Sequence, residues 1–284
     1  MSRKYKQFFG FMALRLAGLI VLFVLFYIIY DIVSKGLSSI NWEFISQPPR
    51  RGMTEGGIYP AIVGTFYVTV ITALVSVPLG MFGAIYLNEY AKKGRLSRLI
   101  RMAIRNLAGV PSIVFGLFGV ALFVQWFNFG PSLISAGFTL GLMTLPVTIT
   151  ASEEALKTVP DAYRKGSLAL GATRWETIKT NVLPLAIPGM MTGSILGLAR
   201  AAGETAPILF TGAAFFLPHL PDSPFSQFMA LPYHLYILAT QHHNISVVRP
   251  IAYATALVLI VLVLLINLTA IILRIKYRKK FENK

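Results

Sequence analysis

The sequence predicts an all-α integral membrane protein with six transmembrane helices. Only 13% of its 284 residues are charged, about half of the ~25% that is usual in soluble domains. Hydrophobic residues make up 55% of the chain, and the mean hydropathy is +0.66. Several stretches stay apolar for the roughly 20 residues that a helix needs to cross ~30 Å of hydrocarbon. Because the backbone must satisfy its own hydrogen bonds in lipid, these stretches are expected to be helices.

Six stretches meet this length requirement. They cover residues 10–31, 59–88, 106–127, 132–151, 184–213 and 250–274. The first follows basic residues, as a secretory signal does, but its apolar run is longer than a signal core and lacks a small-residue cleavage pattern. We therefore expect a retained helix, with residues 1–58 forming this helix and an external loop. Residues 59–284 are expected to form the core, with the other five helices.

Small residues four positions apart occur within two of the predicted spans. They are Gly137 with Gly141 and Gly193 with Gly197. Such pairs allow two helices to approach closely. Glycine is also common in membrane helices in general, and the sequence leaves both interpretations open.

The basic residues are distributed unequally between the predicted loops. Most of the 26 lysines and arginines lie in the N-terminal arm, in the loops after the second and fourth spans, and in the C-terminal tail. The other side has only Lys35, Arg50, Arg51 and Arg249. Because positive residues stay in the cytoplasm, both termini are predicted to be cytoplasmic in a prokaryotic inner membrane. This bias explains the net charge of +15 without a nucleic acid partner. The run Lys92–Arg105 is expected to face anionic lipid, with contact to a partner protein as the alternative.

Two short helices are predicted in the longest cytoplasmic loop, residues 152–183. The first begins near Pro160 or Asp161, and Gly171 is suited to end it in a left-handed conformation. The second opens with Thr173 and Glu176 at the spacing of a capping box and ends before Pro184. Two capped helices joined at a glycine form a rigid elbow. The elbow either docks a partner or simply connects two spans, and both possibilities remain open at this point.

This loop resembles the EAA loop of permeases that belong to ATP-binding-cassette (ABC) importers. Gly171, Leu183 and Pro184 lie at the spacing of the family pattern. The residues that the resemblance assigns to coupling are Lys165, Gly166, Ser167, Gly171, Ala172, Leu183 and Pro184. The chain departs from the family pattern at Lys165, where Glu is usual, and at Asn181, where Ile is usual. The resemblance implies that the loop is a coupling element, which inserts into a groove of a separate cytoplasmic ATPase.

The sequence contains no nucleotide site of its own. It has no G-x-x-x-x-G-K-[ST] phosphate loop, so ATP and Mg are expected on a partner and no cofactor on this chain. The absence of cysteine excludes disulfides and thiolate metal sites. His242 and His243 form an external pair that we expect to be loop surface rather than a metal site. No Ser/His/Asp arrangement indicates acyl transfer, so no catalytic residue is predicted and the chain is expected not to be an enzyme.

The fifth span carries a charged motif that includes Arg200, Glu204 and Thr205. From Pro184 to Arg200 a helix rises ~24 Å at ~1.5 Å per residue, which places Arg200 within the membrane. A lone charge there costs at least ~2.5–3.5 kcal/mol, so we expect a buried guanidinium that faces the bundle interior or a water-filled path. Glu204 lies four residues later and on the same helix face. The pair is either a structural ion pair or a site where Arg200 binds an anionic substrate, with Glu204 and Thr205 assisting its release.

The run Arg200-Ala-Ala-Gly-Glu-Thr-Ala-Pro207 and the segments that start at Gly56, Gly109 and Leu145 resemble the A-type permease subunits of phosphate importers. The resemblance covers residues 56–213 and the last span. It implies transport of inorganic phosphate by alternating access. It also implies a heterodimer with a second, homologous permease, two cytoplasmic ATPase subunits and an external phosphate-binding protein.

Other functions remain as alternatives. A related importer would carry sulfate, molybdate or another oxyanion through the same fold. An ion-coupled secondary transporter or a channel would need no ATPase. A membrane-bound enzyme would need convergent catalytic groups.

Overall fold

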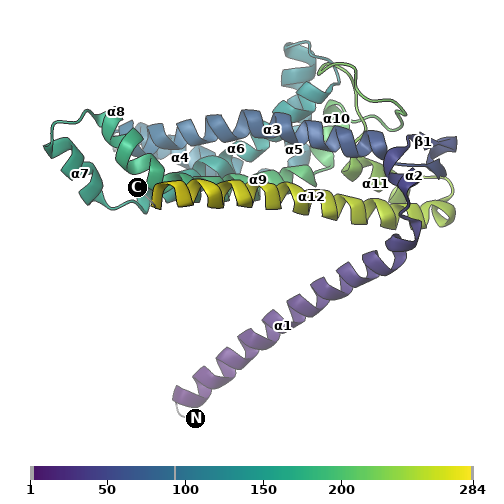
Figure 1. Cartoon of the computed structure of the whole chain (residues 1–284), viewed down its shortest axis with the longest axis horizontal. Helices are drawn as coiled ribbons and strands as arrows, with labels where there is room; N and C mark the ends of the chain where they lie inside the picture. Colours follow the sequence, from purple (N-terminus) through teal and green to yellow (C-terminus); the bar gives the residue numbers. More distant parts are fainter. Residues whose placement is uncertain (1–2, 93, 283–284) are drawn as a thin grey trace.

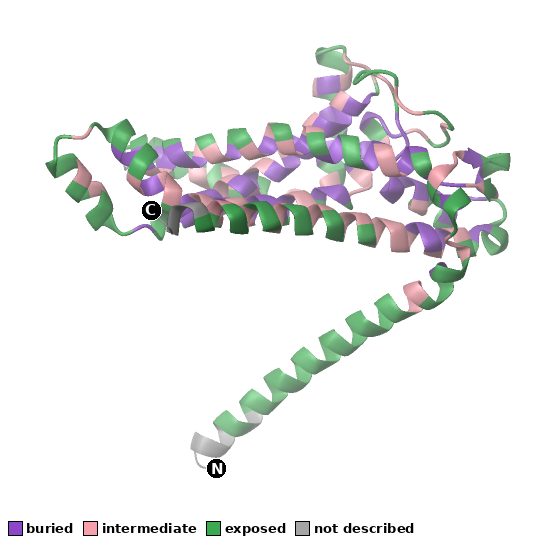
Figure 2. Ribbon diagram, viewed as in Figure 1, coloured by how far each residue is buried: buried purple, intermediate pink, exposed green. Residues whose placement is uncertain are grey.

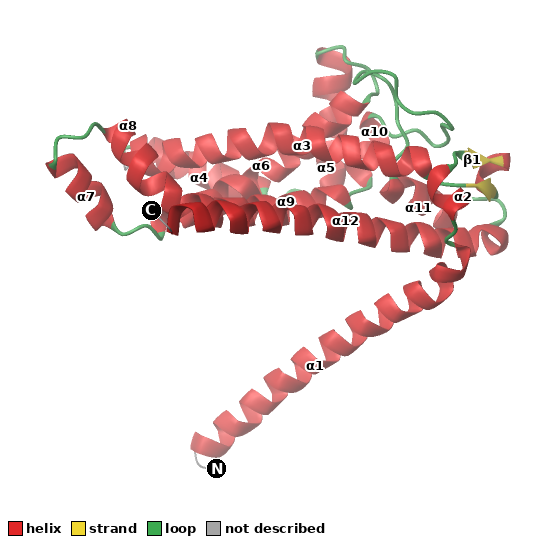
Figure 3. Ribbon diagram, in the orientation of Figure 1, coloured by secondary structure: helices red, strands yellow, loops and turns green. Residues whose placement is uncertain are grey.

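The computed structural model describes residues 3–92 and 94–282. Lys93 and Lys284, which contributed to the predicted charge bias, lie outside the described residues, as do the first two residues and residue 283. The described chain is mostly helical, and its long helices, apart from the one nearest the N-terminus, run along one axis of the molecule (Figures 1 and 3).

Four long helices pack side by side, and a fifth leaves the bundle. The packed helices are α3 (Tyr59–Ile85), α6 (Leu133–Lys157), α9 (Leu183–Ala202) and α12 (Ile245–Glu282). Helix α1 (Arg3–Gly36) contacts α12 near its own end, where Gly36 lies against the Tyr253 backbone, and then diverges from the bundle (Figure 1). The residues of α1 that lie away from the bundle are exposed (Figure 2).

The shorter elements gather at the two ends of this bundle. One end carries α7 (Asp161–Ala169) and α8 (Arg174–Thr177), and we call it the α7–α8 end. The opposite end, which we call the α2–α11 end, carries α2 (Trp42–Ser46), the antiparallel strands β1 (Pro49–Arg50) and β2 (Glu55–Gly56), and α11 (Leu231–Thr240).

The remaining elements complete the spans. They are α4 (Arg95–Leu107), α5 (Ser112–Gly119), α10 (Ala206–Thr211), the π-helical segments η3 (Tyr86–Tyr90), η4 (Val120–Trp126) and η5 (Ile178–Val182), and the single 3-10 turns η1 (Leu37–Ser39) and η2 (Arg51–Met53). Segment η3 continues α3, and η4 continues α5.

The third predicted span, residues 106–127, is not one straight helix. Helix α4 and the segment Ser112–Trp126 are bent by 104° at the break between them. Pro111 lies at this break in an extended conformation, with ψ 142°. A proline favours a break at this point, because it disfavours a helical conformation of the residue before it and cannot donate to the previous turn. Of the described helices, five are long and apolar enough to cross a membrane, and a sixth span exists only if this bent pair is counted as one.

The fifth predicted span, residues 184–213, also differs from the prediction. It divides into α9 and α10 at Gly203–Thr205. At its other end it begins earlier than predicted, because α8 runs through the π-helical η5 into α9 as one candidate span, Arg174–Ala202. Pro184 therefore lies within a continuous helix and does not separate α8 from the span. The π-helical segment η5 lies just before this proline, which has no backbone N–H to donate to the preceding turn.

Glycines allow α6 to lie against α3 and α9. A side chain on Gly137 would overlap Ile71, and one on Gly193 would overlap the Ala151 methyl group. At Gly197 a Cβ would lie 2.9 Å from Thr144 Cγ2. Both predicted small-residue pairs therefore lie at close helix contacts, and the interpretation of these glycines as mere composition is excluded.

Candidate functional site

The charged motif of the fifth span lies at the break between α9 and α10. Helix α9 ends at Ala202, and the backbone turns with Gly203 N–H donating to the Arg200 carbonyl at 3.1 Å. Arg200 Nε donates to Glu204 Oε1, also at 3.1 Å. The sequence prediction that these two side chains pair is confirmed. Thr205 is the N-cap residue of α10, but its side chain makes no capping hydrogen bond, so its hydroxyl can act as a neutral donor.

Arg200 is not buried within this chain, contrary to the sequence prediction. Its side chain is 58% exposed, whereas that of Glu204 is 17% exposed. The reason is the helical register of α9. Gly193 and Gly197 pack against α6, which turns Leu196 and Arg200 outward. The guanidinium therefore lies on an otherwise apolar outer face of the bundle.

The α7–α8 end has the elbow that the sequence predicts. Helix α7 begins at Asp161, and Gly171 ends it with φ +87°, a left-handed conformation that glycine adopts without strain. Thr173 and Glu176 form a complete capping box, in which Thr173 N–H donates to Glu176 Oε2 at 2.8 Å and Glu176 N–H donates to Thr173 Oγ1 at 3.3 Å. The Thr173 hydroxyl also lies 2.8 Å from Glu176 Oε2 and donates to it. The two hydrogen bonds that Thr173 donates stabilise the carboxylate and lower the pKa of Glu176.

The residues of the EAA-like pattern lie in two groups. Lys165, Gly166 and Gly171 are exposed on the elbow, and Ala172 is half-buried at its corner. Ser167 points inward, and its Oγ accepts from Thr177 Oγ1 at 3.0 Å and from Asn181 Nδ2 at 3.1 Å. The second group, Leu183 and Pro184, is half-buried, and Leu183 packs against the core at this end. The pattern thus describes both an exposed surface and its attachment to the bundle.

Large apolar side chains surround the exposed part of the elbow. Tyr163, Leu168 and Trp175 are about half exposed, and Leu170 is 90% exposed. A group of apolar side chains on short polar helices beyond the end of the bundle is typical of a protein-binding surface. This surface favours docking over the alternative of a hairpin that merely connects two spans.

Two buried ion pairs at the α7–α8 end were missed by sequence reasoning. Arg164 Nη2 lies 2.7 Å from Glu89 Oε1, and Arg101 Nε lies 2.6 Å from Glu153 Oε1. Both glutamates end apolar spans and are only 6% exposed. The place of each glutamate at the end of an apolar span could have indicated an ion pair, because a carboxylate that is buried there without a cation is strongly unfavourable. The sequence could not identify the partner of each glutamate, since several arginines in the same predicted loops were equally plausible partners.

The histidine pair at the α2–α11 end is partly structural. His242 is buried, contrary to the prediction of loop surface, and its Nε2 lies 2.8 Å from the Gly52 carbonyl oxygen. His243 stacks on it and remains exposed. In the residues that the structure describes, no cluster of three or more histidine or acidic side chains could hold a metal.

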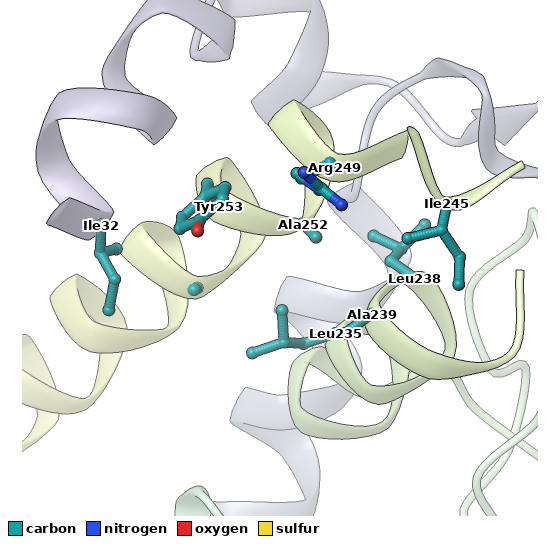
Figure 4. Close-up of a pocket in the computed structure, with 9 residues that line it drawn as sticks. Ile32, Leu235, Leu238, Ala239, Ile245, Arg249, Ala252 and Tyr253 are labelled. Carbon is teal, nitrogen blue, oxygen red and sulfur yellow. The ribbon is translucent and has the colours of Figure 1, made fainter. Parts of the chain in front are cut away.

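A cavity of about 300 Å³ lies between α1, α11 and α12 at the α2–α11 end. Figure 4 shows Leu235, Leu238 and other apolar side chains around it, with Arg249 and the Tyr253 hydroxyl as polar groups. No residue of the Arg200 motif or of the elbow lines it. This cavity therefore belongs to neither candidate site.

The chain is similar over most of its length to known membrane transport proteins. The family model described as the binding-protein-dependent transport system inner membrane component matches residues 76–279. A probable ABC transporter permease protein of Bacillus subtilis, YqgI, is 35% identical over 251 residues, covering 84% of this chain and 85% of that protein. The phosphate transport system permease protein PstA 1 of Mycobacterium tuberculosis (strain H37Rv) is 34% identical over 259 residues, covering 90% of this chain and 83% of that protein.

Solved structures of lower identity share the fold. A chain of a bacterial ABC transporter involved in the import of the acidic polysaccharide alginate has a TM-score of 0.67 at 14% identity, covering 96% of this chain and 98% of that chain. A chain of the MetNI methionine ABC transporter has a TM-score of 0.62 at 17% identity, covering 76% of this chain and 94% of that chain.

These matches confirm the resemblance that the EAA-like loop indicated. They also confirm that the chain is a transport subunit rather than an enzyme, since the family consists of membrane components of transporters. The chain belongs to the family of binding-protein-dependent transport system inner membrane components, the permeases of ABC transporters.

Proposed function

We propose that this chain is the permease subunit of an ATP-driven importer of inorganic phosphate, which works by alternating access. The observation that carries the proposal is the relationship, across nine-tenths of the chain, to a permease named for phosphate transport. The Arg200 motif supplies the chemistry that such a substrate requires.

Arg200 is the proposed contact for phosphate. A guanidinium presents several N–H donors in a planar fork, which fits two oxygens of a tetrahedral oxyanion. Glu204 occupies one of these donors at 3.1 Å and lowers the net positive charge, so that phosphate is released rather than trapped. Thr205 contributes a neutral donor one residue further on.

The exposure of Arg200 fits a pathway shared between two subunits. A guanidinium facing lipid would cost at least ~2.5–3.5 kcal/mol. The face of α9 that carries Leu196 and Arg200 is therefore expected to meet a second, homologous permease, with a water-filled path between the two chains. This heterodimer would bury the apolar part of the face and leave the guanidinium accessible to the substrate.

The other partners follow from the elbow and the family. Two cytoplasmic ATPase subunits would bind ATP and Mg and receive the elbow through Lys165, Gly166, Gly171 and the apolar side chains around them. An external phosphate-binding protein would deliver substrate at the α2–α11 end. In this arrangement both termini are cytoplasmic, and the basic helix α4 faces anionic lipid.

Uptake of labelled phosphate tests the proposal. The chain is expressed with its neighbouring transport genes in a strain that lacks its own phosphate importers, and uptake is measured with excess sulfate or molybdate as competitors. Phosphate uptake that depends on this chain and resists both competitors is the expected result. Uptake of sulfate or molybdate instead would assign another oxyanion, and uptake without a co-purifying ATPase would indicate a secondary transporter.

A further inference from the structure

Helix α7 is tied to the spans by two of its side chains that point toward the bundle. Ser167 accepts hydrogen bonds from Thr177 and Asn181, which belong to the continuous helix that leads into α9. Arg164 reaches in a different direction, toward η3, the segment that ends the α3 span, and toward the end of α6. The remaining α7 residues are exposed. Helix α7 therefore connects three spans, and its contact with two of them depends on one guanidinium.

The guanidinium of Arg164 is fully engaged. Its Nη2 and Nε lie 2.7 Å and 3.1 Å from the two carboxylate oxygens of Glu89, in a bidentate arrangement. Nη1 donates to the Val159 carbonyl at 2.7 Å, and Nη2 also donates to the Leu156 carbonyl at 2.9 Å. Leu156 is in the last turn of α6, so Arg164 also satisfies carbonyls that the helix end leaves unpaired.

Glu89 depends on this arginine. Its side chain is 6% exposed, and it also accepts a hydrogen bond from the Asn88 side-chain amide at 2.8 Å. Displacing α7 from the bundle would leave a buried carboxylate without a cation, which is strongly unfavourable. The end of α3, the end of α6 and α7 are therefore held together as one body.

We propose that the Arg164–Glu89 pair is the link that transmits a displacement of α7 to α3 and α6. Arg164 is then a positioning residue for transport, which acts on the spans and not on phosphate. This inference rests on the proposed function, in which an ATPase moves the elbow. A lysine at position 164 would keep the charge but could not reproduce the bidentate contact and the two carbonyl contacts together.

The test uses the assembled transporter in lipid vesicles. Phosphate uptake and ATP hydrolysis are measured for wild type, Arg164→Lys, Glu89→Gln and the exchanged pair Arg164→Glu with Glu89→Arg. Arg98→Lys is the matched control, because Arg98 is an exposed arginine at the same end of the bundle. The decisive quantity is the amount of phosphate transported per ATP hydrolysed.

The single variants are expected to bind the ATPase and to hydrolyse ATP at near the wild-type rate. Their transport per ATP should fall about tenfold, the scale of losing a charge-assisted hydrogen bond. The exchanged pair should recover part of the loss, and Arg98→Lys should match wild type. An unchanged ratio in both single variants would overturn the proposal, and so would failure of Arg164→Lys to assemble, since that would make Arg164 merely structural.

A second measurement does not depend on the substrate. The chain has no cysteine, so spin labels can be attached to cysteines introduced at the exposed positions Ala162 in α7 and Leu79 in α3. The distance between them should stay constant on ATP binding in wild type and change in Arg164→Lys. If the label distance changed equally on ATP binding in wild type and in Arg164→Lys, the proposed link would be overturned. This outcome does not depend on whether phosphate is the substrate. Absence of phosphate uptake in wild type, with a constant label distance, would reject only the proposed function.

Discussion

Arg200 and Arg164 both pair with a glutamate, but their surroundings differ. The Arg164 side chain is 18% exposed and its donors are directed at Glu89 and two backbone carbonyls, whereas the Arg200 side chain is 58% exposed and uses Nε for Glu204. A guanidinium whose donors are all engaged is a structural link. One with unused donors can accept a further anion. We therefore assign Arg164 to the transmission of movement and Arg200 to substrate binding.

Arg200 variants test the substrate role at the scale of one side chain. Arg200→Gln removes the charge and should reduce phosphate uptake about tenfold or more, since a hydrogen bond to a charged group contributes ~1.5–3 kcal/mol. Arg200→Lys keeps the charge but loses the fork, so intermediate uptake is expected. Initial uptake rates over a range of phosphate concentrations provide the measurement.

The control for Arg200 is Arg249→Gln, which removes an exposed arginine from the cavity at the α2–α11 end. It should leave uptake unchanged, and both variants should assemble with the ATPase. Wild-type uptake by a normally assembled Arg200→Gln protein would leave Arg200 and Glu204 as a structural ion pair.

At the scale of elements, the contact between α6 and α9 fixes where the substrate motif faces. Gly193 and Gly197 lie against α6 and bring the two helix backbones close together. In lipid such contacts are stabilised by dispersion forces and not by the hydrophobic effect, so close approach is important for the stability of the bundle. The same contact turns Arg200 to the outer face.

Gly193→Ala should destabilise this contact. The new methyl group would overlap that of Ala151, and overpacking of this kind typically costs ~1–3 kcal/mol. Thermal unfolding of the purified chain in detergent should show a lower Tm. Ala151→Gly in the same protein should restore part of the loss.

Gly18→Ala is the matched control for Gly193→Ala. Nothing lies within 4 Å of a side chain at Gly18, so its Tm should equal that of wild type. An unchanged Tm for Gly193→Ala would mean that the two helices are not held at this distance.

At the scale of the whole molecule, the two ends of the bundle have different properties. The α7–α8 end carries two buried arginine–glutamate pairs and an exposed apolar elbow. The α2–α11 end carries a small hairpin, a buried histidine and an apolar cavity. Helix α1 leaves the bundle (Figure 1), so in the membrane its surface is available to lipid or to another subunit.

The orientation of these ends is testable with single cysteines. A cysteine at Asp222, in the loop before α11, should react with a membrane-impermeant maleimide in intact spheroplasts. A cysteine at Ala162 in α7 should react only after permeabilisation, because the positive-inside rule places the basic end in the cytoplasm. The natural chain has no cysteine and provides the blank. Equal labelling of Ala162→Cys in intact spheroplasts would reverse the orientation and contradict docking to a cytoplasmic ATPase.

Much of the fold could be predicted because it depends on local chemistry. Apolar length predicts the spans, and Gly171 and the Thr173–Glu176 spacing predict the elbow, since a left-handed residue and a capping box involve only near neighbours. The break at Pro111 and the continuity of the helix through Pro184 were not predicted. A proline permits both a sharp bend and a continuous helix, and the packing around it decides between them.

By itself, the sequence determined that this chain is a helical membrane protein with a capped elbow and a charged motif in its fifth span. Charge distribution, apolar length and capping residues carry that information within a few turns of helix. Only the tertiary structure decided that Arg200 faces outward and that Arg164, of several basic residues nearby, pairs with Glu89. The reason is that burial and ion pairing depend on which helix faces meet, and those faces come together from segments far apart in the chain.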